Sequence, residues 1–176
     1  MKIIKTKFKD LVVIQKETHT DNRGFFRELF VEKKLNIQFP FDVMSFSKKN
    51  VIRGLHLQTK KPQGKMITVI KGSIFDVAVD CRSKSKTFGK YFSMILSEKN
   101  NISLYIPEGF AHGICSLEND TILHYKCTNY RDPKSETAIY WNDPKLKIKW
   151  PVKKPIVSDK DSINQTFLNF SKKVFF

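Results

Sequence analysis

The feature that most constrains the fold is an alternation of apolar and polar residues with a period of two. It runs through short segments rich in Val, Ile, Phe and Tyr, such as KMITVIKG (65–72), SIFDVAVDCR (73–82) and TILHYKCTNY (121–130). Turn-forming groups of Gly, Pro, Asn and Asp separate these segments at short intervals. Because a strand places successive side chains on opposite faces, the pattern predicts an all-β protein. Many short strands in a chain of this length favour a jelly roll of the sandwich or barrel type.

Helical periodicity is confined to two places. RELFVEKKLN (27–36) predicts one short helix, and the apolar spacing in KDSINQTFLNFSKKVFF predicts a helical segment over about 161–176. The chain has 176 residues and contains neither an internal repeat nor a low-complexity linker. We therefore expect one domain over 1–176.

The net charge of +15 raises the question of a nucleic-acid partner. Only five of the 32 basic residues are arginines, and the lysines are scattered from Lys2 to Lys173 without interleaved Arg and aromatic residues. We therefore predict no nucleic-acid partner. Arg23 and Arg53 stand apart because each lies beside a glycine in an apolar context, where a bidentate guanidinium suits a phosphate group.

The N-terminal segment MKIIKTKFKD has no continuous apolar run, and no stretch of the chain approaches the ~20 apolar residues of a membrane span. We therefore expect a cytoplasmic protein without a membrane partner. Cys81, Cys115 and Cys127 are odd in number and lack C-x-x-C spacing, which indicates neither disulfides nor a zinc site. We expect them to be small buried apolar residues.

Two histidine motifs carry the first sign of a site. His56 follows Gly54 in RGLH, and PEGFAH combines Pro107, Gly109 and His112 directly after a predicted strand. Together with Gly72, which opens another strand, these motifs resemble the two-part cupin signature. The resemblance implies a cupin-type jelly-roll barrel that holds both motifs in its interior and carries its short helices at the periphery.

The metal ligands of typical cupins are largely missing here. Most cupins bind a metal through H-x-H, a glutamate and the histidine of the second motif, but Gln58 and Lys65 replace the second histidine and the glutamate. A lysine in place of a carboxylate disfavours a divalent cation through its charge and through the lost oxygen ligand. We therefore predict no metal and no cofactor. A cavity with Lys, Arg and His suits an anionic substrate whose chemistry requires a base.

A resemblance to one particular family within the cupins extends over nearly the whole chain. A series of motifs is similar, in order and spacing, to the dTDP-4-dehydrorhamnose 3,5-epimerase family: DNRGFFRE (21–28), NVIRGLHLQ (50–58), PQGKMITVIKGSIFDVAVDCR (62–82), SKTFG (85–89), YIPEGFAHG (105–113), YKCTNY (125–130), WNDP (141–144), IKWP (148–151) and VSDKD (157–161). The resemblance implies an isomerase of dTDP-rhamnose biosynthesis. Its substrate would be a nucleotide-linked 4-keto-6-deoxyhexose, dTDP-4-dehydro-6-deoxyglucose, whose C3 and C5 it would invert to give dTDP-4-dehydrorhamnose.

The same resemblance implies a set of catalytic residues. His56 matches the family's base, and Asp161 matches the carboxylate that pairs with it. Tyr125 matches the acid on the opposite face of the sugar ring, and Lys65 matches the cation near the C4 oxygen, where an enolate develops. Asp80 is a second candidate partner for the histidines, ranked below Asp161.

Substrate-binding positions follow from the same matching: Arg23, Phe26, Glu28, Arg53, His112 and Tyr130. Among these, Arg23 and Arg53 would contact the diphosphate, and His112 would line the pocket. Members of the family form homodimers in which N-terminal strands cross to the partner. The resemblance therefore implies that Arg23 completes the neighbour's site.

Several alternatives remain open at this point. His56, Tyr125, Asp161 and His112 each have a purely structural interpretation, as barrel, core, capping or packing residues. Relatives of this fold epimerise C3 alone with the same residue set, so the second candidate is a C3-only or C5-only epimerase. A non-catalytic sugar-nucleotide-binding cupin and a metal-dependent cupin enzyme are the candidates from other classes. The segment 43–50 and Arg131 depart from the family pattern, which leaves the preferred nucleotide base open.

Overall fold

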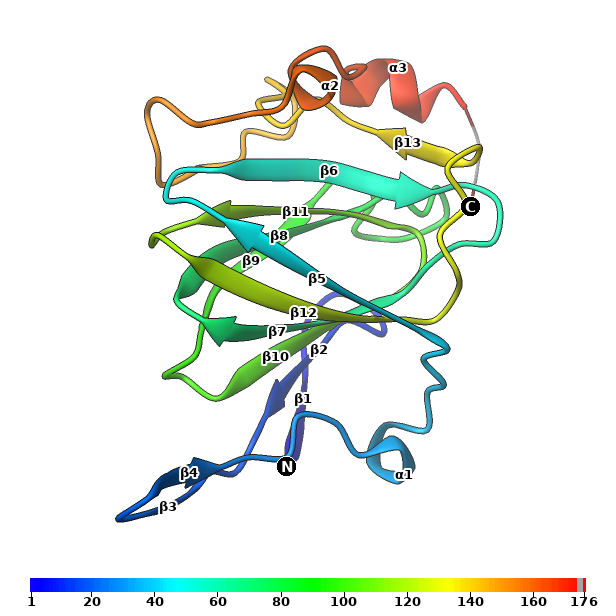
Figure 1. The fold of residues 1–176 in the computed structure, drawn as a ribbon. Coiled ribbons are helices and arrows are strands. Elements are labelled where there is room, and N and C mark those ends of the chain that lie inside the picture. The colour runs from blue at the N-terminus through cyan, green and yellow to red at the C-terminus, as the bar shows by residue number, and fades with distance from the viewer. Residues whose placement is uncertain (174–175) are drawn as a thin grey trace.

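The computed structural model describes residues 1–173 and 176, and its long strands form two antiparallel sheets that enclose a core (Figure 1). The first sheet has the order β1-β2-β10-β7-β12-β5, with bounds Lys2–Lys5, Val12–Gln15, Ile102–Ile106, Lys65–Lys71, Thr121–Cys127 and Phe41–Ser47. The second has the order β13-β6-β11-β8-β9, with bounds Glu136–Ala138, Ile52–Gln58, Phe110–Ser116, Ser73–Asp80 and Tyr91–Ser97. This arrangement confirms the predicted all-β jelly roll.

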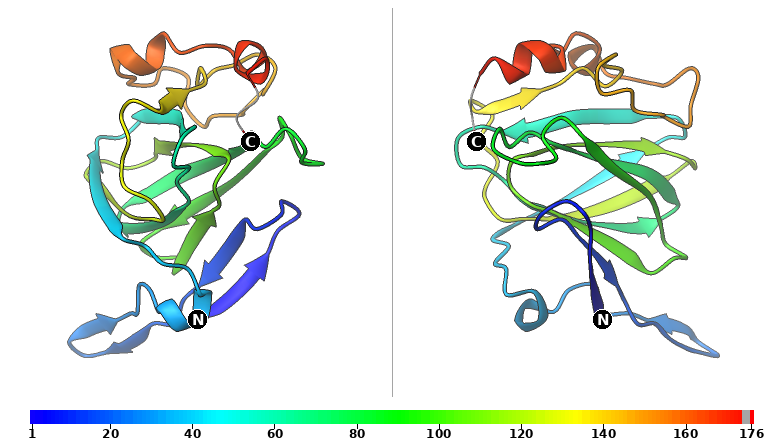
Figure 2. Two further views of the ribbon diagram at one scale, coloured as in Figure 1. Left: turned by 90° about the vertical axis from the view of Figure 1, so that its right-hand side faces the viewer. Right: turned by 180° about the vertical axis from the view of Figure 1, so that it is seen from behind.

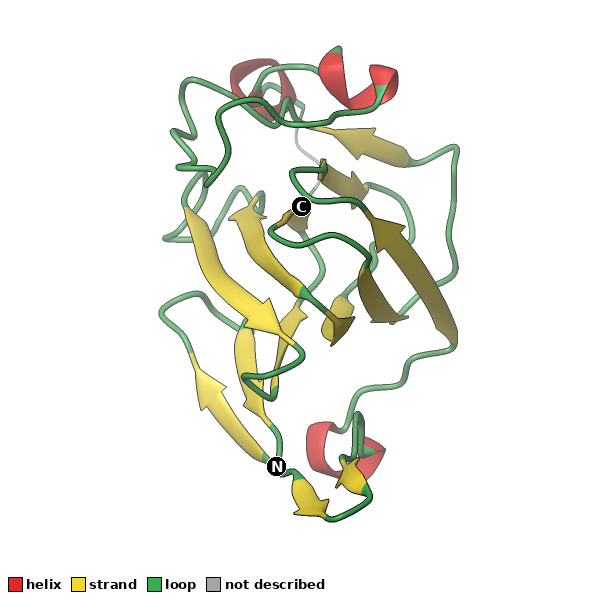
Figure 3. Ribbon diagram, turned by 60° about the vertical axis from the view of Figure 1, so that its left-hand side comes forward, coloured by secondary structure: helices red, strands yellow, loops and turns green. Residues whose placement is uncertain are grey.

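The two sheets form two layers (Figure 3), and the main core packs between them. Ile67 and Leu123 from the six-stranded sheet pack in one buried cluster with Ile74 and Ile114 from the five-stranded sheet. The alternation seen in the sequence thus turns one face of each strand inward, as period-two patterning requires.

A second core covers the other face of the five-stranded sheet. Here Leu55 and Val77 pack against Phe167 and Phe170 from the C-terminal segment. Because β8 is covered on both faces, nearly all of its side chains are buried, including Asp76 and Asp80. The C-terminal segment is therefore part of the structure that supports β6.

The helices are short and peripheral, as predicted, but the C-terminal helix is not continuous. It is divided into α2 (Asp159–Ser162) and α3 (Phe167–Ser171). The reason is that Gln165 forms a parallel bridge with Ile139, and its carbonyl accepts a hydrogen bond from Tyr140 N, so its backbone cannot join a helix. The prediction of one helical segment over about 161–176 therefore holds within α3 but not for the residues between α2 and α3, and residues 174–175 lie outside the described residues.

An N-terminal hairpin stands away from the barrel in every view (Figures 1 and 2). It consists of β3 (His19–Asp21) and β4 (Gly24–Phe26), and it is followed by α1 (Glu32–Leu35). The helix predicted over 27–36 is thus confined to its C-terminal half. Phe25 and Phe26 on the hairpin are 65% and 67% exposed. Such exposure of neighbouring aromatic side chains is typical of a surface that meets another protein.

The three cysteines are buried, as predicted, and burial raises the pKa of the Cys81 thiol to about 12. A thiol with a raised pKa stays protonated and unreactive at neutral pH. Within the described part of the chain, no helix combines the length and the apolar character needed to cross a bilayer.

Lys16 is an unusual residue in the six-stranded sheet region because it is only 4% exposed and has no carboxylate partner among the described residues. Its Nζ donates a hydrogen bond to Thr68 Oγ1 at 3.3 Å. Burial and the nearby charge of Arg27 lower the pKa of Lys16 to about 8. The folded state therefore disfavours the charged amine that the unfolded chain holds up to a pH of about 10.4.

We predict that Lys16→Met raises the free energy of unfolding at pH 7, by roughly 2–3 kcal/mol if burial of the charge is the main cost. The unfolded chain binds more protons than the folded one between pH 8 and about 10, so wild-type stability rises over this interval and the difference shrinks. Urea denaturation from pH 7 to pH 10 measures the difference in the free energy of unfolding between the wild type and Lys16→Met. Lys2→Met on the exposed strand β1 is the control. A stability difference between the wild type and Lys16→Met that does not change with pH contradicts the prediction.

Candidate active site

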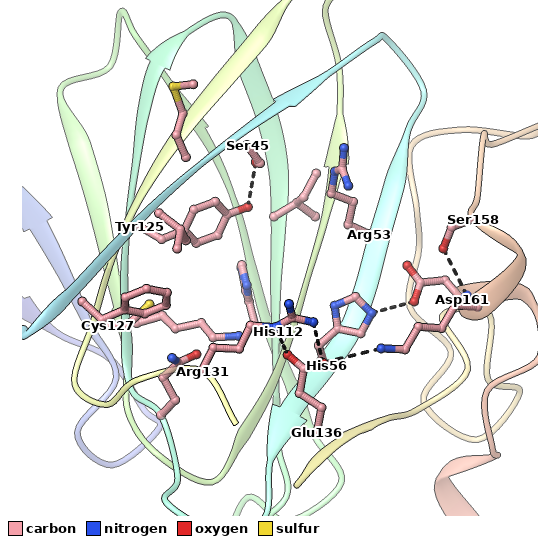
Figure 4. A pocket seen from close by; sticks show the side chains of 17 residues that line it. Ser45, Arg53, His56, His112, Tyr125, Cys127, Arg131, Glu136, Ser158 and Asp161 are labelled. Carbon is pink, nitrogen blue, oxygen red and sulfur yellow. Dashed lines mark hydrogen bonds and ion pairs between the residues drawn. The ribbon is translucent and has the colours of Figure 1, made fainter. Parts of the chain in front are cut away.

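A cavity of about 510 Å³ opens on one side of the barrel and collects most of the predicted site residues (Figure 4). Its lining includes residues from both sheets and from α2: Arg53, His56, Lys65, His112, Tyr125 and Asp161. These side chains come from five elements, β6, β7, β11, β12 and α2, which span the chain from Ile52 to Ser162. Their convergence in one concave site gives each of them a possible function beyond packing.

The two histidine motifs meet across the pair β6–β11, where His56 lies opposite His112. This meeting depends on a close approach of the strand backbones at Gly54 and Gly113. A Cβ added to Gly54 would lie 2.5 Å from Gly113 Cα, and the φ of Gly54 is +140°. Only glycine combines this conformation with so little space.

His56 forms a short hydrogen bond with Asp161, from Nε2 to Oδ1 at 2.6 Å. Asp161 is 4% exposed and lies in α2, whose first turn is capped by the hydroxyl of Ser158. Burial alone would raise the pKa of the Asp161 carboxyl, but the hydrogen bonds and charge of His56, with the Gly54 N–H and Asn164, hold it below its usual value. Because Asp161 engages Nε2, Nδ1 is the imidazole nitrogen that can accept a proton.

Tyr125 and Lys65 enter the cavity from the other sheet, on the neighbouring strands β12 and β7. Burial raises the pKa of Tyr125 to about 12, although Ser45 and Arg53 partly oppose this. Burial lowers the pKa of the Lys65 amine, while nearby groups that include Glu136 and Asp76 oppose the change. The cavity thus holds a phenol that stays protonated and an amine from the opposite sheet to His56.

His112 is buried and donates a hydrogen bond from Nε2 to Asp76 Oδ2 at 2.9 Å. The prediction that Asp80 is a second partner for the histidines is wrong. Asp80 instead accepts hydrogen bonds from Arg82, Ser85 and Thr87, at 2.6–2.9 Å. These local donors satisfy its carboxylate outside the cavity.

Arg53 is held at the cavity wall by β5. Its Nε donates to Ser47 Oγ at 3.1 Å, and its Nη2 donates to the carbonyl of Phe46 at 2.9 Å. The remaining guanidinium hydrogens are available to an anion in the cavity.

Gln58, which stands where cupins place a metal ligand, directs its side chain at backbone groups. Its amide group contacts Lys61 O, Tyr130 O and Asp132 N. The described residues contain no group of three or more His, Cys, Asp or Glu side chains placed to hold a metal ion.

Four predicted substrate-binding residues do not reach this cavity within one chain. Arg23, Phe26 and Glu28 lie on or just after the projecting hairpin, and Arg23 pairs with Asp21 at 2.6 Å. Tyr130 lies at the rim, where its ring contacts that of Phe41 at 6.0 Å between centroids. Phe41 itself lines the cavity.

Other lining residues were not identified from the sequence. Glu136 accepts a hydrogen bond from Arg131 at 2.8 Å and lies 3.5 Å from Lys160, so it joins two cations at the cavity wall. Ser45 lies 3.3 Å from the hydroxyl of Tyr125. Ser45 and Arg131 had a signal, because the segment 43–50 and Arg131 both depart from the family pattern, whereas Glu136 belongs to no motif that indicates a site.

We predict that Gly54→Ala lowers the free energy of unfolding by roughly 3 kcal/mol more than Gly24→Ala does, because only Gly54 faces backbone atoms. Gly24 is a matched control: its φ is +130°, but a Cβ there would meet nothing within 4 Å. Urea denaturation of both variants measures the difference. Equal losses would mean that backbone conformation, and not strand approach, dominates at Gly54.

Comparisons with known proteins agree with this fold. The sequence model for dTDP-4-dehydrorhamnose 3,5-epimerase matches residues 5–169. An enzyme of that name from Methanothermobacter thermautotrophicus is 43% identical over 168 residues, which cover 91% of each chain.

Two solved structures extend the comparison. The dTDP-6-deoxy-D-glucose-3,5-epimerase of Legionella pneumophila, in complex with dTDP-4-keto-L-rhamnose, is 42% identical with a TM-score of 0.89 and covers 94% of this chain and 92% of its own. The dTDP-4-dehydrorhamnose 3,5-epimerase of Bacillus anthracis, with TDP and PPi bound, is 41% identical with a TM-score of 0.92 and covers 94% and 99%. The match spans both sheets and all the elements that line the cavity, and this chain belongs to the dTDP-4-dehydrorhamnose 3,5-epimerase family.

Proposed function

We propose that this chain inverts C3 and C5 of dTDP-4-dehydro-6-deoxyglucose to give dTDP-4-dehydrorhamnose. The observation that carries the proposal is the placement of an imidazole–carboxylate pair and a protonated phenol in one cavity, on strands of opposite sheets. The Legionella relative binds dTDP-4-keto-L-rhamnose, which is a product of the proposed type.

The substrate's C4 ketone determines what the site must do. It acidifies the C–H bonds at C3 and C5, because the carbanion formed at either carbon delocalises onto O4 as an enolate. In the glucose configuration these two hydrogens lie on the same face of the ring. One base on that face and one acid on the opposite face can therefore serve both carbons.

His56 acts as the base through Nδ1. Imidazole accepts a proton near neutral pH, and Asp161 stabilises the imidazolium that forms because its buried carboxylate stays ionised. The hydrogen bond to Nε2 also keeps the ring in one orientation and one tautomer.

Lys65 stabilises the enolate. Its amine lies in the cavity beside the strand that carries Tyr125, and a preorganised cation at a developing oxyanion is worth about 3 kcal/mol in comparable sites.

Tyr125 delivers a proton to the opposite ring face. With its pKa raised to about 12, the phenol remains protonated at neutral pH and transfers its proton only to a strongly basic carbanion. Removal of a proton on one face and delivery on the other inverts the carbon.

The nucleoside diphosphate extends toward the cavity rim. Arg53, held by Ser47 and Phe46, offers its guanidinium to the diphosphate. The rings of Phe41 and Tyr130 at the rim, which are tilted by 48° against each other, supply apolar faces for the base. Binding of TDP and PPi by the Bacillus relative supports a diphosphate subsite in this cavity.

We predict that His56→Ala abolishes exchange of solvent deuterium into C3 and C5, because no other group in the described cavity is placed as the base. Tyr125→Phe keeps exchange, since His56 still abstracts the proton, but the rate at which inverted product forms falls by roughly 10²- to 10⁴-fold. NMR of dTDP-4-dehydro-6-deoxyglucose in D₂O measures both quantities.

Tyr105→Phe is the matched control, because burial also raises the pKa of Tyr105 to about 12 but its side chain does not line the cavity. It is expected to leave exchange and inversion unchanged. A folded wild-type protein that exchanges neither carbon would refute the proposed function, and exchange at one carbon alone would establish single epimerisation.

We also propose that the chain works as a homodimer in which the projecting hairpin reaches the partner's cavity. The hairpin carries Arg23 and the exposed rings of Phe25 and Phe26, and none of them lines the cavity of its own chain. Arg23 pairs with Asp21, but its side chain is 85% exposed and therefore accessible to a second copy. In the partner's site it would complete the cation set for the diphosphate.

This arrangement predicts complementation between two inactive variants. We expect Arg23→Ala and His56→Ala homodimers to be nearly inactive, whereas a mixed dimer contains one whole site. If Arg23 acts across the dimer, purified mixed dimers carrying two tags should recover about half of the wild-type rate. If Arg23 acts in its own chain, the mixed dimer has no whole site and stays inactive, which would contradict the proposal.

A further inference from the structure

Two inversions by one base and one acid leave the site in the wrong protonation state after the first. Each inversion moves one proton from carbon to His56 and one from Tyr125 to carbon. After the first inversion His56 is therefore protonated and Tyr125 is a phenolate. The second inversion requires both groups to be reset, and this requirement rests on the proposed function.

The structure supplies a hydroxyl beside the group that must be reprotonated. Ser45 Oγ lies 3.3 Å from the Tyr125 hydroxyl, which makes no other hydrogen bond within the described residues. Ser45 is half-buried and lines the cavity (Figure 4). It belongs to β5, which is the edge strand of its sheet and lies next to solvent.

The register of β5 aims Ser45 at the cavity. Val43 pairs with Tyr125 in the β12–β5 ladder, so these two side chains lie on the same face of the sheet. Ser45 follows Val43 by two residues and therefore lies on that inner face as well. Ser47, the next residue on this face, accepts a hydrogen bond from Arg53. The ring of His112 lies edge-on to Tyr125 at 6.2 Å between centroids, and its Nε2 is held by Asp76.

We propose that Ser45 is a positioning residue through which Tyr125 recovers its proton between the two inversions. The Ser45 O–H proton passes to the phenolate oxygen, and Ser45 Oγ takes a proton from a water molecule at the cavity mouth. The resulting hydroxide is neutralised by the proton that His56 releases to solvent, so the site returns to its starting state without net change.

The geometry and electrostatics fit this transfer. The distance of 3.3 Å is long for an O–H···O bond, and hydrogen bonds of this kind commonly shorten when substrate binds. A hydroxyl donor also stabilises the phenolate, and the contact with Ser45 already opposes the rise in the pKa of Tyr125 that burial causes.

The test measures how the singly inverted sugar divides between release and second inversion. For Ser45→Ala we expect exchange at the first carbon to persist, because His56 and Asp161 are untouched. The rate of the second inversion relative to release should fall by roughly 10- to 100-fold, as expected for a lost hydrogen bond to a charged oxygen. Ser45→Thr keeps the hydroxyl and should restore the wild-type ratio. NMR of the product mixture during turnover gives the ratio directly.

Ser47→Ala is the matched control from the same face of β5. Because Ser47 contacts Arg53, this variant should raise KM without changing the ratio. Should Ser45→Ala fail to fold, Ser45→Val also removes the hydroxyl, with a side chain that suits a strand, and should show the same lowered ratio.

Three results would overturn the proposal: an unchanged ratio in Ser45→Ala or Ser45→Val, no rescue by Ser45→Thr, or a wild-type protein that inverts only one carbon. Absence of exchange at either carbon in the wild type would instead refute the proposed function itself.

Discussion

The close approach of β6 to β11 at Gly54 and Gly113 is the constraint on which the site depends. It brings the two histidine motifs opposite each other and turns the Gly54 N–H toward Asp161, 3.4 Å from its carboxylate. With any larger residue at Gly54 the strands would separate, and His56 would lose its place between the barrel and α2. The same pair of strands therefore supports both the fold and the chemistry.

A second constraint is the balance of charge in the cavity. Arg53, Lys65 and the imidazolium that His56 becomes after proton transfer would repel one another in a dry site, but two buried carboxylates and an anionic substrate oppose this repulsion. Asp161 stabilises the form of His56 that exists only after proton transfer, whereas Asp76 holds His112. The two imidazoles lie on one strand pair and each meets a carboxylate through Nε2, but the His56 side chain is 39% exposed to the cavity whereas that of His112 is only 6% exposed.

Much of this could be predicted from the sequence, because the relevant signals are local. Period-two alternation predicted the sheets, and motif matching placed His56, Lys65, Tyr125 and Asp161 in one cavity. The errors arose where long-range contacts compete with local preference. The apolar spacing after residue 160 predicts a helix, but the bridge between Gln165 and Ile139 interrupts it.

The partner of His112 shows most clearly what only tertiary structure decides. Asp76 and Asp80 lie on the same face of β8, and each is two residues from Ala78, the residue opposite His112. Alternation therefore cannot choose between them, and the choice falls to Asp76 because Arg82, Ser85 and Thr87 satisfy Asp80. The sequence by itself determined the all-β architecture, the residue types of the chemistry and the replacement of metal ligands by Gln58 and Lys65. Register and packing decided which carboxylate meets which histidine and that Ser45 lies beside Tyr125, because these contacts join strands whose alignment no local pattern encodes.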